Sequence, residues 1–403
     1  MGSSLRGGWE VRKLGEVAIV SSGNSAPQKK ELFNNGIFPF IRTSDVGKIR
    51  KGIIDSSSDN LNEDGIKKLR LFKKGTILFP KSGASTFLNH RVIMKIDAYV
   101  SSHLATIKSN NISKDEFIWY YLITIDAKDL MQNIAYPSLK LSDIKQIPIP
   151  VPPLQEQEKI VVILDEVFSA IAKAKANAEL NLQNAKELFE SYLQGVFENK
   201  GEEWEEKTLG EMADFRNGIN FAKNAKGKVI KIVGVKNFQK NFLVPLDNLE
   251  IISLDGEIKN NDLLLDGDIL AVRSNGNPKL IGRTILAKNI SENTTHSGFT
   301  IRIRLNLSIL FSEYLCHYLK TQKTREILIK SGNGVGIKSL NQGSLSLLSI
   351  PFPPLQTQKQ IVKKLNTLQE QTKKLESIYA QKLQDLDELK KSILQKAFNG
   401  EIL

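Results

Sequence analysis

The sequence predicts a duplicated fold, in which two mixed α/β (α+β) bodies are separated by a long antiparallel two-helix coiled coil. The first observation is a repeat, because PPLQEQEKIV at residues 152–161 returns as PPLQTQKQIV at residues 353–362. The second is that heptads of apolar residues follow each copy. The third is the distribution of charge. Residues 1–153 contain 22 Lys and Arg against 14 Asp and Glu, and residues 200–352 contain 21 against 16. Residues 154–199 contain only 4 Lys and Arg against 8 Asp and Glu, and residues 353–403 contain 9 against 6. Two basic bodies therefore alternate with two nearly neutral arms.

The repeat extends over most of the chain. Residues 138–161 align without a gap to residues 339–362, with 11 identities in 24 positions. Upstream, WEVRKLGEVA from Trp9 matches WEEKTLGEMA from Trp204, and GTILFPKSG from Gly75 matches GDILAVRSN from Gly267. We therefore expect the order body, arm, body, arm, at residues 1–153, 154–199, 200–352 and 353–403.

Each body combines short strands with an aromatic helix. In the first body, strand-forming runs at residues 38–43, 76–80, 91–96 and 104–108 precede EFIWYYLITI at residues 116–125. In the second body, KVIKIVGV, DILAVR, GRTILA and FTIRIR precede SEYLCHYLK at residues 312–320. The aromatic residues of the two helices recur at helical spacing, which favours a core role over base stacking.

Each arm should be one long helix that begins at the double proline. We call the repeated proline-glutamine motif (residues 152–161 and 353–362) the joint. About 45 residues without proline follow each double proline. Proline suits a first helical turn, because the N–H that it lacks would have no helical partner there. Two such helices, separated by a folded body, pair most simply in antiparallel orientation. Asn181 and Lys382 share one seam position, where a polar group commonly sets register. The helix-pairing residues that we expect are Ile160, Leu164, Val167, Ile171, Asn181, Leu188, Ile361, Leu365, Leu368, Leu375, Tyr379 and Leu386.

The loops between the strands carry side chains that suit DNA. Arginine and lysine match guanine edges and phosphates, asparagine and glutamine match adenine, and hydroxyls match either bases or phosphates. These loops differ between the bodies while the framework agrees, so we expect each body to read a different sequence. The candidates are Arg42, Thr43, Ser44, Lys48, Lys81, Ser82, Thr86, Asn89, His90, Arg91, Lys140, Lys236, Asn237, Gln239, Arg273, Ser274, Asn275, Asn277, Lys279, Arg283, His296 and Lys338.

Sequence patterns for catalysis are missing. A methyltransferase of the N-P-P-Y type would need an aromatic residue that Asn277-Pro278-Lys279-Leu280 does not supply. The nearest approach to a nucleotide-binding P-loop is GNGVGIKS at residues 332–339, in which Ile337 separates glycine from lysine, so a glycine-rich turn near DNA is the preferred interpretation. The four histidines lack metal-ligand spacing. We expect neither a catalytic residue nor a metal site.

The composition indicates in which cellular compartment the protein resides. The single cysteine, Cys316, cannot form an internal disulfide, which agrees with a reducing cytoplasm. No apolar run approaches the roughly 20 residues of a membrane span, and no cleavable signal opens the sequence. We expect a cytoplasmic protein.

The order of bodies and arms resembles the specificity subunit of type I restriction-modification enzymes. The residues that carry the resemblance are the two proline-glutamine joints, SILQKAFNGEIL at the end of the chain, and the FIRTSDV, GTILFPKSG and GDILAVRSN stretches. The resemblance covers essentially the whole chain. It implies two target-recognition domains that read an asymmetric, bipartite double-stranded DNA site, with the helices as spacer and as docking surface for methyltransferase subunits.

The resemblance also implies that chemistry belongs to partner chains. S-adenosylmethionine would be bound by two methyltransferase subunits, and ATP and Mg²⁺ by restriction or translocase subunits, with none bound by this chain. Two other hypotheses stay open: a self-contained restriction or methylation enzyme, and a structural or RNA-binding coiled-coil protein. Methylation by the isolated chain would favour the first, and tight binding to all nucleic acids without a preferred duplex would favour the second.

Overall fold

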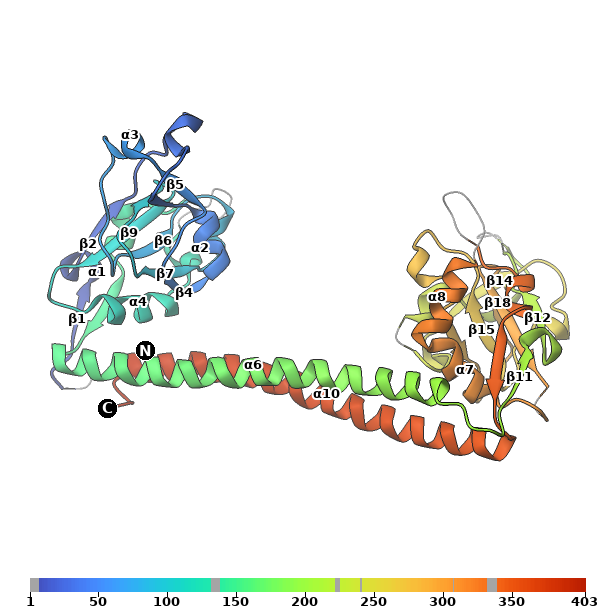
Figure 1. Ribbon diagram of the computed structural model, residues 1–403. Coiled ribbons are helices and arrows are strands. Elements are labelled where there is room, and N and C mark those ends of the chain that lie inside the picture. Colours follow the sequence, from blue (N-terminus) through green and yellow to red (C-terminus); the bar gives the residue numbers. More distant parts are fainter. Residues whose placement is uncertain (1–6, 132–137, 222–224, 240, 307, 332–338) are drawn as a thin grey trace. The chain divides into compact units, whose positions relative to one another are not determined.

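The structure, a computed structural model, describes residues 7–131, 138–221, 225–239, 241–306, 308–331 and 339–403. The chain forms two compact units, of which unit 1 comprises Met1–Ala178 with Gln381–Leu403 and unit 2 comprises Glu179–Ala380. Each unit holds one mixed α/β body and part of both long helices, α6 (Leu154–Glu198) and α10 (Leu355–Phe398) (Figure 1). The predicted fold class, a repeated α/β body with two long helices, is confirmed.

Unit 1 contains a five-stranded sheet of order β2-β9-β6-β7-β4, a three-stranded sheet of order β5-β3-β8, and the antiparallel pair β1-β10. Its elements besides the long helices are β1 (Glu10–Lys13), α1 (Leu14–Val17), β2 (Ala18–Ser22), η1 (Lys30–Phe33), β3 (Phe38–Ile41), α2 (Thr43–Ile49), β4 (Lys51–Ile54), β5 (Asp59–Leu61), α3 (Glu63–Ile66), β6 (Ile77–Pro80), η2 (Ala84–Leu88), β7 (Arg91–Met94), β8 (Tyr99–Val100), β9 (Leu104–Ser109), α4 (Asp115–Thr124), η3 (Ala127–Leu130), α5 (Leu141–Lys145) and β10 (Pro148–Val151).

Unit 2 repeats this plan with a four-stranded sheet of order β12-β18-β15-β16, a three-stranded sheet of order β14-β13-β17, and the pair β11-β19. Its elements besides the long helices are β11 (Glu205–Thr208), η4 (Leu209–Glu211), β12 (Ala213–Asn217), β13 (Lys228–Val233), η5 (Val235–Phe238), η6 (Leu246–Asn248), β14 (Glu250–Leu254), η7 (Asn260–Asp262), β15 (Ile269–Val272), η8 (Pro278–Leu280), β16 (Thr284–Leu286), β17 (Thr294–His296), β18 (Thr300–Leu305), α7 (Ser312–Lys320), α8 (Gln322–Lys330), α9 (Gln342–Ser346) and β19 (Ser349–Phe352).

The main core of each body lies between its larger sheet and the long helices. In unit 1 the aromatic helix α4 buries Phe117 and Leu122 against strand residues such as Ile107 and against Ile160 of α6. Alternate residues of the central strands enter this core, as the two-residue period of a strand requires. The expected core role of the aromatic helices is therefore confirmed.

Within each unit the two long helices run antiparallel. In unit 1 Lys175 pairs with Asp387 at 2.7 Å, and the ammonium of Lys390 lies 4.4 Å from the ring centroid of Phe168. Leu394 shares its core with Ile160. The residue numbers on α10 therefore decrease as those on α6 increase, which is the antiparallel order. In unit 2, Leu193 and Phe197 of α6 share a core with Val362 and Leu365 of α10.

The buried stripe on the helices departs from a strict heptad. Ile160, Leu164, Ile171 and Leu365 are buried as expected, and Val167, Asn181, Ile361, Leu368, Tyr379 and Leu386 are half-buried. Leu188 and Leu375 are 49% and 38% exposed, so their expected place on the seam is wrong. A straight α-helix drifts by about 20° per heptad, which moves the stripe by nearly one residue after four heptads. Buried Leu193 beside exposed Tyr192 shows this shift.

The repeated joint is fixed by its second glutamine. Gln157 is fully buried, with Oε1 accepting from Ser113 Oγ at 2.7 Å and from the Lys114 N–H at 2.9 Å, and Nε2 donating to the Pro152 carbonyl at 2.8 Å. Gln358 repeats the arrangement, accepting from the Phe311 N–H at 2.9 Å and donating to the Pro353 carbonyl at 2.8 Å. In both units this one side chain ties the start of a long helix to the start of the aromatic helix.

Acid is expected to lower the stability of unit 2 through His317, a buried residue of α7 that contacts Asn366 of the long helix α10. Burial, opposed by the hydrogen bond with Asn366, lowers the pKa of His317 to about 4. An unfolded histidine titrates near its ordinary value of 6.5, so as pH falls from 6.5 towards 4 the unfolded state takes up the proton first. Stability contributed by neutral His317 is therefore present above pH 6.5 and is lost in this window, by about 3 kcal/mol.

Chemical denaturation at pH 7 and pH 4.5 would measure this effect, with hydrogen exchange of α7 reporting the local change. A His317→Gln variant keeps a group that can hydrogen-bond Asn366 but does not titrate, so its stability should fall less between these pH values. An unchanged pH dependence in this variant would contradict the assignment.

Candidate nucleic-acid interface

In the first body, backbone hydrogen bonds bring four separate segments to one edge. The N–H of Ser101, after β8, donates to the carbonyl of Ile41 at the end of β3 (2.9 Å). The N–H of Lys81, after β6, donates to His103 (3.0 Å), and the N–H of Leu139 donates to Lys81 (2.8 Å). The candidate stretches that begin at residues 42 and 81, and the stretch around residue 139, therefore lie next to one another. The first of them forms the helix α2 over Thr43–Ile49 and not the loop that we expected.

The second body repeats these three bonds. Ser297 donates to Val233 (3.0 Å), Arg273 donates to Phe299 (2.8 Å), and Leu340 donates to Arg273 (2.8 Å). Lys81 and Arg273 thus occupy equivalent places, as the repeat of GTILFPKSG in GDILAVRSN indicates. We call this edge, with the loops that it gathers, the reading edge of each body.

Most of the sequence-predicted candidates have side chains that reach solvent. In the first body these are Arg42, Thr43, Ser44, Lys48, Lys81, Ser82, Asn89 and Lys140; in the second they are Lys236, Gln239, Arg273, Ser274, Asn275, Asn277, Lys279 and Arg283. Lys338 lies outside the described residues, as does most of the glycine-rich stretch 332–339. Side chains of this kind, brought together on one surface, can contact phosphates and base edges.

Arg42 is held in place rather than free. Its guanidinium pairs with Asp59 and lies 5.5 and 5.1 Å from the ring centroids of Phe33 and Phe40. The backbone of Arg42 caps α2, where its N–H donates to the carboxylate of Asp45 at 2.9 Å. A guanidinium oriented in this way loses less side-chain entropy when it binds a ligand.

Five candidates are buried, and their expected contact with DNA is corrected for the chain as it is folded here. The exposed fraction of the residue is 0% for Thr86 and Arg91, 1% for His296, 5% for Asn237 and 9% for His90. His296 Nδ1 bonds Thr300 Oγ1 at 2.9 Å, and burial lowers its pKa to about 3, so the ring is neutral and carries no charge for a phosphate. Asn237 is a turn residue that accepts from the Gly234 N–H at 2.8 Å.

Arg91 is the most deeply buried of these charges. It is the first residue of β7, which lies between β6 and β4 in the five-stranded sheet. Its Nη1 donates to the carbonyl of His90 at 2.8 Å, and its guanidinium lies 3.2 Å from the ring centroid of Phe79. Burial lowers its pKa to about 9. Half-exposed Asn89 also has a structural role, because Nδ2 donates to Asp126 at 2.9 Å and Oδ1 accepts from the Ala127 N–H at 2.8 Å.

Sequence reasoning missed a supporting arginine in the second body. Arg325 of α8 donates to the carbonyls of Ile281 (2.7 Å) and Lys279 (3.0 Å), which fixes the loop that carries Lys279. Burial, and then the neighbouring Arg283, lower the pKa of Arg325 to about 10, so it remains charged at neutral pH. Arg283 donates to the Gln239 carbonyl at 3.0 Å. These cations give the loop the positive potential that a polyanion requires.

Sequence reasoning also missed His103 and Phe299, which occupy equivalent places at the two reading edges. His103 Nδ1 bonds Ser82 Oγ at 2.7 Å, and Phe299 is 60% exposed. Phe299 was assigned to a strand because FTIRIR has strand character, whereas β18 begins one residue later, at Thr300. The alignment of SSHLATIK (101–108) with SGFTIRIR (297–304) was the signal that could have marked both positions.

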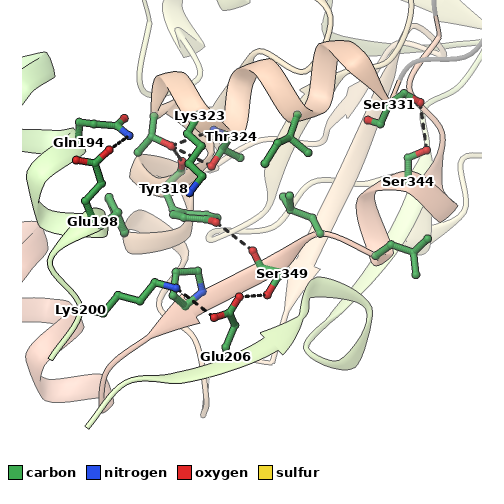
Figure 2. Close-up of a pocket in the computed structure, with 16 residues that line it drawn as sticks. Gln194, Glu198, Lys200, Glu206, Tyr318, Lys323, Thr324, Ser331, Ser344 and Ser349 are labelled. Atoms are coloured by element: carbon green, nitrogen blue, oxygen red, sulfur yellow. Dashed lines mark hydrogen bonds and ion pairs between the residues drawn. The ribbon is translucent and has the colours of Figure 1, made fainter. Parts of the chain in front are cut away.

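A cavity of about 550 Å³ lies in unit 2 where α6 ends and β19 begins. Figure 2 shows three interactions among its polar groups: Lys200 pairs with Glu206 at 3.1 Å, Glu206 accepts from Ser349 Oγ, and the Tyr318 hydroxyl donates to the Ser349 carbonyl at 3.0 Å. The residues that line it include no His, Cys or Asp.

Two further properties concern the described residues only. They contain no cluster of three His, Cys, Asp or Glu side chains arranged to hold a metal ion. None of their helices combines the length and apolar character that crossing a membrane requires.

Comparison with known proteins gives one consistent family. Residues 6–182 and 201–384 each match the family described as type I restriction modification DNA specificity domain. The type I restriction enzyme MjaIX specificity subunit of Methanocaldococcus jannaschii is 32% identical over 41% of this chain and 38% of its own length. The StySPI specificity subunit of Salmonella potsdam is 28% identical over 66% of this chain and 60% of its own length. These two matches thus span less than two thirds of the relatives.

Longer matches exist at lower identity. The putative MjaX specificity subunit of Methanocaldococcus jannaschii is 22% identical over 98% of this chain and 93% of its own length. A solved structure described as a study of complex assembly and conformational transition of the type I R-M system superimposes with a TM-score of 0.78, at 20% identity and with both chains fully covered. The HsdS subunit of Thermoanaerobacter tengcongensis gives a TM-score of 0.66 at 21% identity, with 99% of each chain covered. These two structures share the fold.

Proposed function

The chain belongs to the type I restriction modification DNA specificity family, and from this premise we propose that it reads an asymmetric, bipartite double-stranded DNA site, one half with each body. The observation that carries the proposal is the reading edge. The same three backbone hydrogen bonds recur in both bodies, but the side chains that they position differ, as with Lys81 and Arg273 or His103 and Phe299. A repeated frame with different contact residues suits two different base sequences.

We further propose that the chain is non-catalytic and that methyltransferase subunits dock on its long helices. Several apolar side chains face solvent on the α6 and α10 segments of unit 2, where Leu180 is 59% exposed, Leu188 49% and Ile378 49%. Such exposed apolar side chains are available for contact with a partner chain. S-adenosylmethionine would then be bound by these partners, and ATP and Mg²⁺ by restriction or translocase subunits.

Sequencing of modified bases in a host that carries this chain and its methyltransferase tests the proposal. The expected result is methylation at one asymmetric bipartite site, dependent on both chains. Methylation by the isolated chain would favour a self-contained enzyme instead. Equal affinity for all nucleic acids would favour a general coiled-coil binding protein.

The two bodies should also respond separately to mutation. If Lys81 and Arg273 contact bases, Lys81→Ala should raise Kd by about 10- to 100-fold and reduce the penalty for scrambling one half of the site, while Arg273→Ala should do so for the other half. Fluorescence anisotropy at fixed salt, with duplexes scrambled in either half, measures both effects.

Lys13→Ala is the matched control, because Lys13 is an exposed lysine of the first body that lies on β1, opposite Pro148 of β10, and belongs to neither candidate stretch. It should alter neither penalty. If Lys81→Ala and Arg273→Ala relaxed the same half of the site, the two bodies would not read separate halves.

A further inference from the structure

The turn between β17 and β18 presents a phenylalanine ring to solvent on a rigid support. Phe299 is 60% exposed, although its neighbours Ser297 and Thr300 are buried. The N–H of Thr300 donates to the Ser297 carbonyl and the N–H of Gly298 donates to the Ile219 carbonyl, both at 2.8 Å. A single exposed apolar residue is common on protein surfaces and alone needs no explanation. The position of this one is informative, because the turn fixes where the ring lies.

The ring belongs to the reading edge of the second body. The Phe299 carbonyl accepts from the N–H groups of Arg273 (2.8 Å) and Ser274 (3.4 Å), and the guanidinium of Arg273 donates to the carbonyl of Gly298 (3.4 Å). One apolar ring therefore adjoins a cation and a hydroxyl that can bind DNA. The first body holds His103 at the same place, so both reading edges carry a ring, but only that of the second body is purely apolar.

We infer that Phe299 contacts the 5-methyl group of a thymine in the half-site that the second body reads, an inference that rests on the proposed function. The major groove presents donors, acceptors and one apolar feature, the thymine methyl, and phenylalanine is among the side chains that contact it. Burying a ring that is 60% exposed against this methyl removes apolar surface of both partners from water. The adjacent Arg273 and Ser274 supply the polar contacts that an apolar ring cannot make. Phe299 thus selects thymine over cytosine at one position.

The test uses the full-length chain with its methyltransferase subunits and the bipartite duplex identified by methylome sequencing. Each thymine of the second half-site is replaced in turn by deoxyuridine, which removes only the methyl group. For the wild-type complex one such replacement should raise Kd by about tenfold. Phe299→Ala should raise Kd on the natural duplex by a similar factor and should be insensitive to deoxyuridine at that position.

Leu265→Ala is the matched control, since Leu265 is 55% exposed in the same body but precedes β15, whereas Arg273 follows that strand. It should bind both duplexes as the wild type does, and thermal unfolding should show that neither substitution alters the fold. The inference fails if Phe299→Ala binds the natural duplex normally. It also fails if every deoxyuridine replacement raises the Kd of this variant as much as that of the wild type. That result is expected if the ring intercalates between base pairs instead. A wild-type complex without preference for any bipartite duplex would overturn the proposed function itself, which distinguishes the two failures.

Discussion

Replacing Gln157 with leucine is expected to lower the free energy of unfolding of unit 1 by about 3 to 5 kcal/mol. The side chain is fully buried and forms three hydrogen bonds, with Ser113, with the N–H of Lys114 and with the carbonyl of Pro152. Leucine has a similar volume but can neither donate nor accept, so these groups would be left buried without a partner. Each such group costs about 1 to 3 kcal/mol, so the expected loss is large for one substitution.

Gln155 supplies the control within the same motif, because it is exposed and two residues away on α6. Gln155→Leu should change stability by less than about 0.5 kcal/mol. Urea denaturation measures the difference, and faster hydrogen exchange at the start of α4 would locate it. Equal stability of the two variants would show that the buried hydrogen bonds do not hold the joint.

This joint illustrates what the sequence can and cannot reveal. The repeat of PPLQEQ as PPLQTQ marks the point where a strand passes into a long helix, and that prediction agrees with β10 and α6 and with β19 and α10. It does not reveal which glutamine is buried, because burial is decided by α4 and α7, which are distant in the sequence. The same limit applies to Leu188, whose exposure depends on helix drift accumulated over four heptads.

The reading edge could be predicted in part for a similar reason. The ends of strands follow from local periodicity, so the stretches that begin at residues 42 and 81 were placed correctly after β3 and β6. The loop expected from residue 42 was wrong, because Thr43–Ile49 form the helix α2. The accessibility of single residues could not be predicted. Arginine is a residue type that often contacts DNA, but Arg91 is the buried first residue of a strand inside the five-stranded sheet. Phenylalanine is usually a core residue, but Phe299 lies at the apex of a turn and is exposed.

The second large effect is expected for Phe398→Ala, which should destabilise unit 1 by about 3 to 5 kcal/mol although Phe398 is the last residue of α10, far from the first body in the sequence. Its ring centroid lies 5.2 Å from that of Phe117 and 5.1 Å from that of Tyr121, both in edge-on geometry, and the residue is only 7% exposed. Alanine would leave a cavity between α4 and the last turn of α10. The first body therefore depends on a residue of α10, which follows the second body in the sequence.

Hydrogen exchange can show which of the two units each substitution destabilises. Phe398→Ala should reduce the protection of amides in α4. Phe197→Ala should do so in α7, because the ring centroid of Phe197 lies 5.2 Å from that of Tyr314 and 5.1 Å from that of Tyr318. Leu389→Ala serves as the control on α10, since that side chain is 46% exposed and should cost little. Loss of protection in α7 rather than α4 after Phe398→Ala would contradict the packing. If the expected pattern holds, the C-terminal end of α10 completes the core of the first body, and the C-terminal end of α6 completes the core of the second. The repeat in the sequence then corresponds to a repeat in core packing.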